Sequence, residues 1–178
     1  MALGKSWGPS TWYLFHCLSL SFRIEKKHKY MEFFRLARSI IPCELCKNHF
    51  IRALNRNENG INNNCSNREK MFKWLIKLHN NVNRMNNKKI MSPEQVLAIH
   101  IKNNKLKINN GKIIKFLIEF VNYNIGLRGW RRDNAFKLLK VLSYIYPSPK
   151  KQLILQRKLE RNKNKRLWLK IYVNVLKK

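Results

Sequence analysis

The chain has 178 residues, of which 38 are Lys or Arg and 9 are Asp or Glu, so its formal net charge is +29. This length allows one sizeable core or two small helical ones. Four cysteines are too few for a disulfide-stapled secreted scaffold, and no window is apolar enough to span a membrane. Residues 1–7 lack the apolar run of a signal peptide, so we expect an intracellular protein with no membrane partner.

The strong positive charge attracts nucleic acid, anionic lipid or acidic proteins in general. The chain is also rich in Asn, Lys and Ile together, which indicates a compositional drift that spreads lysine over every solvated face. It has no Arg-rich tail, zinc-finger spacing or glycine-aromatic RNA-binding signature. Nucleic-acid binding is therefore possible but not the favoured interpretation.

Apolar residues recur at helical spacing almost throughout, which predicts an all-α fold. A helix from Ser10 as N-cap to residue 24 comes first, and a polar loop is expected over residues 55–64. Five helices are predicted before residue 102, over residues 10–24, 28–40, 42–55, 66–87 and 92–101. They make a compact unit, a four-helix bundle with a short crossing fifth helix.

Two predicted helix starts carry a capping signature. Ser66-Asn67-Arg68-Glu69 and Ser92-Pro93-Glu94-Gln95 both have the form of a capping box, the second with proline at the first helical position.

The polar, Asn-rich run 102–111 is the predicted boundary between residues 1–104 and a C-terminal helical extension, residues 105–178. Three more helices are predicted there, over residues 112–125, 131–146 and 150–176. Faint similarities to the first half leave two interpretations open, a degenerate repeat or an unrelated extension.

Cys43 and Cys46 are separated by two residues, so they can close a small disulfide or supply half of a metal site. Pro42 fits the start of a helix, which would put Cys43 over the first turn, where the helix dipole favours a thiolate. Cys46 would lie one turn further on nearly the same face. The pair is typical of a redox dithiol, but its spacing alone leaves the metal alternative open.

Two other stretches offer groups that suit a flat cofactor. Trp12 and His16 are four residues apart and share a helix face; His79 and Asn83 do the same, with Asn80 on the rim. Two such faces beside the dithiol would form a slot that stacks on an adenine or isoalloxazine ring and bonds its polar edges. Taken singly, each aromatic residue or histidine is more often structural, and it is their joint occurrence with a dithiol that favours a cofactor site.

Three motifs in order resemble the Erv/ALR family of FAD-linked sulfhydryl oxidases, whose pattern is W-G-x-x-x-W-x-x-L-H, C-x-x-C and H-N-x-V-N. Here they read Trp7-Gly8-Pro9-Ser10-Thr11-Trp12-Tyr13-Leu14-Phe15-His16, then Cys43-Glu44-Leu45-Cys46, then His79-Asn80-Asn81-Val82-Asn83. Phe15 stands where the family usually has Leu. The resemblance covers about residues 7–100.

The resemblance implies a thiol oxidase that forms disulfides in thiol-containing protein substrates. Electrons would pass from substrate thiols through the Cys43–Cys46 disulfide to FAD and then to molecular oxygen, giving hydrogen peroxide. Cys46 takes the position nearer the flavin, and Cys43 exchanges with the substrate. Seven residues match family positions at the FAD site: Trp7, Trp12, His16, His79, Asn80, Asn83 and Lys88. The resemblance gives Lys88 the role of a cation near the phosphates.

Family members commonly form homodimers, so the resemblance also implies a homodimer. Small members without a shuttle dithiol are best known from viruses, and the composition is compatible with a viral protein of the host cytoplasm or nucleus, or of the virion. Cys17 is expected to be a buried apolar residue of the first helix. Cys65 is expected to be a free thiol or a partner in a mixed disulfide.

The main alternative is a zinc-stabilised, basic nucleic-acid-binding helical protein. Its metal site would use Cys43, Cys46, Cys65 and a histidine such as His49, whereas the sulfhydryl oxidase interpretation requires no metal. A thioredoxin-type protein would need a βαβ pattern around the dithiol, against which the helical periodicity argues.

Overall fold

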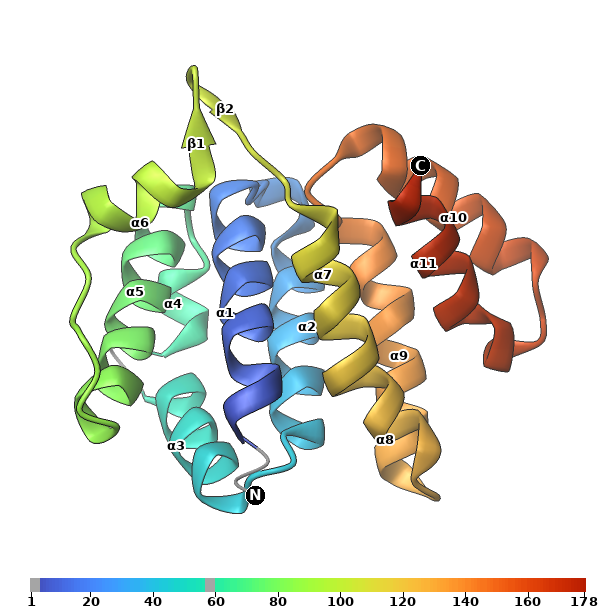
Figure 1. Ribbon diagram of the computed structural model, residues 1–178, viewed down its shortest axis with the longest axis horizontal. Coiled ribbons are helices and arrows are strands. Elements are labelled where there is room, and N and C mark those ends of the chain that lie inside the picture. Colours follow the sequence, from blue (N-terminus) through green and yellow to red (C-terminus); the bar gives the residue numbers. More distant parts are fainter. Residues whose placement is uncertain (1–3, 57–59) are drawn as a thin grey trace.

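The computed structural model describes residues 4–56 and 60–178, and within these ranges the regular secondary structure is helical apart from one short hairpin (Figure 1). The all-α prediction is confirmed. Part of the predicted loop, residues 57–59, and the start of the N-terminal segment, residues 1–3, lie outside the described residues.

The five helices predicted for the first half occur in the predicted order, and a short 3-10 turn over Ile24–Lys26 joins the first two. The predicted loop over residues 55–64 is wrong at its end, where residues 61–64 form an additional helix. Its α-helices are α1 (Gly4–Leu20), α2 (Lys27–Ile40), α3 (Glu44–Asn55), the short α4 (Ile61–Asn64), α5 (Arg68–Met85) and α6 (Pro93–His100).

Helix α1 begins and ends earlier than predicted. Ser10 is not its N-cap, because α1 already runs from residue 4 and Ser10 lies inside it. The hydroxyls of Ser10 and Thr11 donate to the carbonyl oxygen of Trp7, at 3.0 and 2.8 Å. The Ser10 hydroxyl therefore bonds back to the preceding turn of the helix and caps no helix start. The local sequence alone favoured a cap, because serine serves in both ways.

One predicted capping box is confirmed and the other is wrong. At α6, the Gln95 backbone N–H donates to Ser92 Oγ and the Ser92 N–H donates to Gln95 Oε1. At α5 the N-cap is Asn67, whose side chain accepts the Lys70 N–H at 2.8 Å, and not Ser66. Asn and Ser are comparable N-caps, so neighbouring candidates leave this start undecided in the sequence.

A β-hairpin occupies the predicted boundary, with β1 (Ile101–Lys102) antiparallel to β2 (Lys105–Leu106). Its two turn residues, Asn103 and Asn104, have φ of 50° and 57°. Asparagine tolerates this left-handed conformation, which two-residue hairpin turns require.

The C-terminal half contains α7 (Asn110–Phe116), a π-helical stretch (Leu117–Asn122), α8 (Tyr123–Gly126), α9 (Trp130–Ile145), α10 (Pro149–Arg161) and α11 (Trp168–Lys177). The single helix predicted over residues 150–176 is therefore wrong. The chain turns back after α10, where the Trp168 indole donates to the Asn162 carbonyl oxygen and Asn164 caps a 3-10 turn. Asparagine side chains that bond the nearby backbone compete with helix continuation.

Helices α1 and α2 lie in the middle of the molecule (Figure 1). Helix α5 packs against α1 on one side, while α7 packs against α1 and α9 against α2 on the other. One continuous core contains side chains of both halves, among them Phe33 and Phe34 of α2 and Leu138 and Leu139 of α9. Within the described residues, we find no helix with both the length and the apolar character of a membrane span.

Candidate redox and cofactor site

Cys43 and Cys46 form a disulfide at the start of α3, with their Cα atoms 5.2 Å apart. Cys43 is the N-cap, and its Sγ accepts the Cys46 backbone N–H at 3.3 Å. The helix therefore starts two residues later than predicted, and Cys43 precedes the first turn instead of lying in it. At this position the amide dipoles of α3 point at Cys43 Sγ and favour negative charge on that sulfur.

Cys46, and not Cys43, lines a small apolar cavity of about 80 Å³. The cavity is enclosed by residues of α1, α3 and α5 together with Ile41. Its other lining residues are Trp7, Gly8, Thr11, Trp12, Phe15, His49, Phe50, Leu78 and Val82.

A larger cavity of about 420 Å³ shares Gly8 and Trp12 with the small one. This volume lies in the range of small-molecule and cofactor sites. Three histidines, three lysines and Asn83 supply the polar part of its lining, and the remaining residues are mostly apolar. These polar residues are His16, His79, His100, Lys88, Lys89, Lys112 and Asn83.

Trp12 and two histidines form part of the contact between α1 and α5. The rings of Trp12 and His79 are stacked, with centroids 4.3 Å apart and planes 9° from parallel. His16 Nε2 and His79 Nδ1 are hydrogen-bonded at 3.0 Å. The structure thus brings together the two helix faces that the sequence predicted to meet.

The histidines of the larger cavity are neutral at physiological pH. Burial, together with the neighbouring His79 and His100, lowers the pKa of His16 to about 3. The pKa values of His79 and His100 fall to about 4, first through burial and then through the charges of Lys88 and Lys112 respectively. In the His16–His79 bond one neutral ring donates and the other accepts. This bond uses Nε2 of His16, and the other ring nitrogen, Nδ1, is buried without a hydrogen-bond partner.

The two asparagines of the third motif hold the chain that follows α5. Asn83 Nδ2 donates to the Lys89 carbonyl oxygen at 3.1 Å, and the Asn83 side chain lines the larger cavity. Asn80 exchanges two hydrogen bonds with the Met91 backbone, at 2.8 and 3.1 Å, and does not line either cavity. Its contacts therefore position the loop that carries the lysines.

The predicted residues Trp12, His16, His79, Asn83 and Lys88 line the larger cavity together. Trp7 lines the small one. The Trp7 ring also contacts Phe120 of the C-terminal half, with ring centroids 5.4 Å apart.

Sequence reasoning missed Tyr13, Lys89, His100 and Lys112 as lining residues. Tyr13 lies within the first motif and Lys89 follows Lys88, so the positions of the motifs could have indicated both. His100 and Lys112 gave no such signal, because α6 and α7 are brought to the cavity only by tertiary packing.

The other two cysteines are free and buried, as expected for Cys17. Burial raises the pKa of both thiols to about 12. Cys17 Sγ lies 3.5 Å from His100 Nδ1, and Cys65 Sγ lies 3.9 Å from the Lys27 carbonyl oxygen. The zinc-ligand group considered above is not assembled among the described residues.

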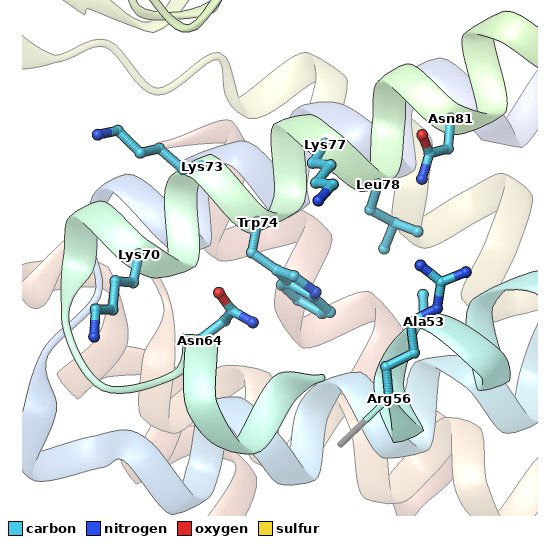
Figure 2. A pocket seen from close by; sticks show the side chains of 9 residues that line it. All are labelled: Ala53, Arg56, Asn64, Lys70, Lys73, Trp74, Lys77, Leu78 and Asn81. Atoms are coloured by element: carbon cyan, nitrogen blue, oxygen red, sulfur yellow. The ribbon is translucent and has the colours of Figure 1, made fainter. Parts of the chain in front are cut away.

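A further cavity of about 260 Å³ lies between α3, α4 and α5 (Figure 2). Figure 2 shows the Trp74 indole among basic side chains, those of Arg56, Lys70 and Lys77. It shares Leu78 with the cavity of Cys46, but no cysteine or histidine lines it. The dithiol therefore does not border this cavity.

Fold and site together define an all-α dithiol protein in which Cys46 borders a small apolar cavity, and that cavity shares Gly8 and Trp12 with a second cavity of cofactor size. The Erv1 / Alr family model matches residues 9–104, which is more than half of the chain. The chain belongs to the Erv1 / Alr family, as its motifs predicted.

Two viral proteins are among its relatives. A probable FAD-linked sulfhydryl oxidase of Acanthamoeba polyphaga mimivirus is 33% identical over 100 residues, covering 53% of this chain and 69% of the relative. A FAD-linked sulfhydryl oxidase of African swine fever virus (isolate Pig/Kenya/KEN-50/1950) is 28% identical over 110 residues, covering 60% of this chain and 89% of the relative. No solved structure matches the chain significantly.

Proposed function

We propose that the chain is a FAD-linked sulfhydryl oxidase, of viral type, that introduces disulfides into thiol-containing protein substrates. The names and viral sources of its relatives support this assignment. The observation that carries it is the position of Cys46. This half of the disulfide borders the small apolar cavity, and Trp12 joins that cavity to the larger one lined by histidines and lysines.

The residues present fit FAD. The buried nitrogens Trp7 Nε1 and His16 Nδ1 have no hydrogen-bond partner in the protein, and each belongs to a residue that lines one of the two cavities. Trp12 and His79 would supply planar surfaces, Asn83 an amide, and Lys88 a cation for the phosphates. When bound, FAD supplies an acceptor for two electrons, which it passes to molecular oxygen to give hydrogen peroxide.

The two cysteines have different roles in this proposal. A substrate thiolate attacks Cys43 Sγ, the Cys43–Cys46 bond breaks, and Cys46 leaves as a thiolate beside the apolar cavity. A second substrate thiol then attacks the mixed disulfide, so that the substrate gains a disulfide and Cys43 is released reduced. The N-cap contact from the Cys46 N–H stabilises negative charge on Cys43 as it leaves. Two electrons and two protons are thereby transferred to the dithiol.

We further propose that residues 1–104 are the catalytic unit and residues 105–178 an extension. The homodimer expected from the family stays a prediction. A second copy would need a surface other than the faces of α1 and α2 that α7 and α9 cover. The host cytoplasm, nucleus or virion is proposed on the resemblance alone.

The visible spectrum of the purified protein tests the cofactor. A flavin band at about 450 nm, with FAD released on denaturation, is expected. Colourless protein that contains zinc and binds DNA with a steep salt dependence would instead support the alternative function.

Cys46→Ser tests the role of the dithiol, with Cys65→Ser as the matched control at a buried cysteine outside the site. Cys46→Ser should keep the flavin band and lose oxygen consumption with dithiothreitol, whereas Cys65→Ser should keep both. Oxygen consumption retained in Cys46→Ser would contradict the proposed role.

A further inference from the structure

Lys112 reaches the proposed cofactor cavity from outside the segment that matches the family. It lies in the first turns of α7, beyond residue 104, yet it lines the larger cavity together with Lys88 and Lys89. These three ammonium groups come from two segments, the loop after α5 and the start of α7. A cavity lined by several cations suits a ligand with more than one negative charge.

The position of Lys112 is fixed by contacts between α1 and the start of α7. The Tyr13 hydroxyl accepts the Asn109 N–H at 2.7 Å and donates to the Lys107 carbonyl oxygen at 3.0 Å. Asn109 in turn caps α7 by accepting the Lys112 backbone N–H at 3.1 Å. The turn that carries Lys112 is therefore tied directly to a helix that carries the first cofactor motif.

The Lys112 side chain extends along the cavity wall. Its ammonium lies 4.9 Å from the centre of the Tyr13 ring, and that ring stacks on His100 at 4.8 Å. Tyr13 and His100 both line the same cavity. The charge of Lys112 contributes to the lowered pKa of His100, as that of Lys88 does for His79, in line with their shared place in the cavity lining.

We infer that the C-terminal extension completes the cofactor site and that Lys112 is a binding residue for the phosphate groups of the cofactor. This inference rests on the proposed function, which supplies the FAD. The extension then helps to retain the cofactor, a role that none of the three motifs in the first half predicts. An ammonium at this position adds attraction for a diphosphate without any contribution to the dithiol chemistry.

The test is the dissociation constant of FAD for the full-length, flavin-free protein, measured by flavin fluorescence. Lys112→Gln should weaken binding about fivefold at low ionic strength, and Lys112→Glu more strongly. The difference should shrink as salt is raised, since the Lys112 side chain is solvent-exposed. Lys112→Arg, which keeps the charge, should restore most of the affinity.

Two charge-matched controls separate a local effect from the loss of net charge. Lys115→Gln removes a cation from the same helix, where Lys115 pairs with Glu119 at 3.6 Å outside the cavity. Lys77→Gln removes one from the cavity of Figure 2. Both should bind FAD as the unmodified chain does, and an equal loss in the controls would contradict the inference.

An FAD dissociation constant within twofold of the unmodified value in Lys112→Glu at low salt would overturn the inference and leave the proposed function intact. If Lys112 served only to cover Tyr13, its variants would lower the thermal stability of the flavin-free protein and leave FAD affinity unchanged, which would also overturn it. Absence of flavin binding by the unmodified chain would remove both proposals.

Discussion

Trp12 of α1 and His79 of α5 lie face to face, with ring centroids 4.3 Å apart and planes within 9° of parallel. This contact joins two sequence motifs, and His79 is further held by the hydrogen bond to His16. Trp12 also lines both cavities of the site, the one of Cys46 and the larger one. Its indole therefore links the dithiol to the proposed cofactor position.

Trp12→Ala should weaken FAD binding about tenfold, because it removes a planar surface from both cavities. The measurement is the FAD dissociation constant of the flavin-free protein. Trp130→Ala is the matched control, since the Trp130 side chain is 53% exposed and lines neither cavity. Unchanged affinity in Trp12→Ala would contradict the assignment of this site.

The stability of the flavin-free protein should fall as the pH is lowered from 7 to 5. His16 is 3% exposed with its pKa lowered to about 3, so below about pH 6.5 the unfolded chain binds a proton that the folded protein does not. At pH 5 this difference costs about 2 kcal/mol for His16 alone. Urea unfolding at several pH values measures it.

The exposed His28 provides the control for this pH dependence. His28→Gln should keep the fall in stability, whereas His16→Gln should reduce it. A free energy of unfolding that does not change between pH 7 and 5 in the unmodified chain would show that His16 is accessible to protons in the folded state.

The number of reactive thiols should depend on unfolding. Cys43 and Cys46 are bonded to each other, while Cys17 and Cys65 are buried with their pKa values raised to about 12. A thiol reagent should therefore detect no fast-reacting thiol in the native oxidised protein and two after denaturation. Reduction before denaturation should add the two thiols of the disulfide. A fast-reacting thiol in the native oxidised protein would mean that one of these assignments is wrong.

Tyr13→Phe should destabilise the protein by about 1 kcal/mol, because it removes the hydrogen bonds to the Lys107 carbonyl oxygen and the Asn109 N–H, two backbone groups that water can then reach. Chemical denaturation gives the change in the free energy of unfolding. Tyr123→Phe serves as the control, since Tyr123 is 42% exposed. Equal effects of the two variants would mean that the Tyr13 hydroxyl does not hold α7 to α1.

Removal of residues 105–178 should change the state of assembly. The fragment 1–104 loses the helices α7 and α9 that cover α1 and α2, and newly exposed apolar surface promotes association. Light scattering on the full chain and on the fragment should therefore give different numbers of copies per particle. Identical oligomers would show that the extension has no influence on assembly.

The sequence predicted the elements whose signals are local. The helical periodicity was enough for the all-α class, and the Ser92 capping box placed the start of α6 correctly. Where two local signals competed, prediction failed: Ser66 stands beside the true cap Asn67, and Ser10 lies inside a helix that starts earlier. The break between α10 and α11 was missed because apolar periodicity outweighed the signal of two asparagines, Asn162 and Asn164, whose side chains bond the nearby backbone.

The sequence by itself determined the family, the dithiol and five residues that line one cavity, because spacing along a helix fixes which side chains share a face. Only the tertiary structure decided that Cys46 borders the apolar cavity, that Asn80 holds the Met91 backbone, and that Lys112 joins the site. These relationships join segments from different helices. They depend on how helices pack against one another, which no local pattern of residues specifies.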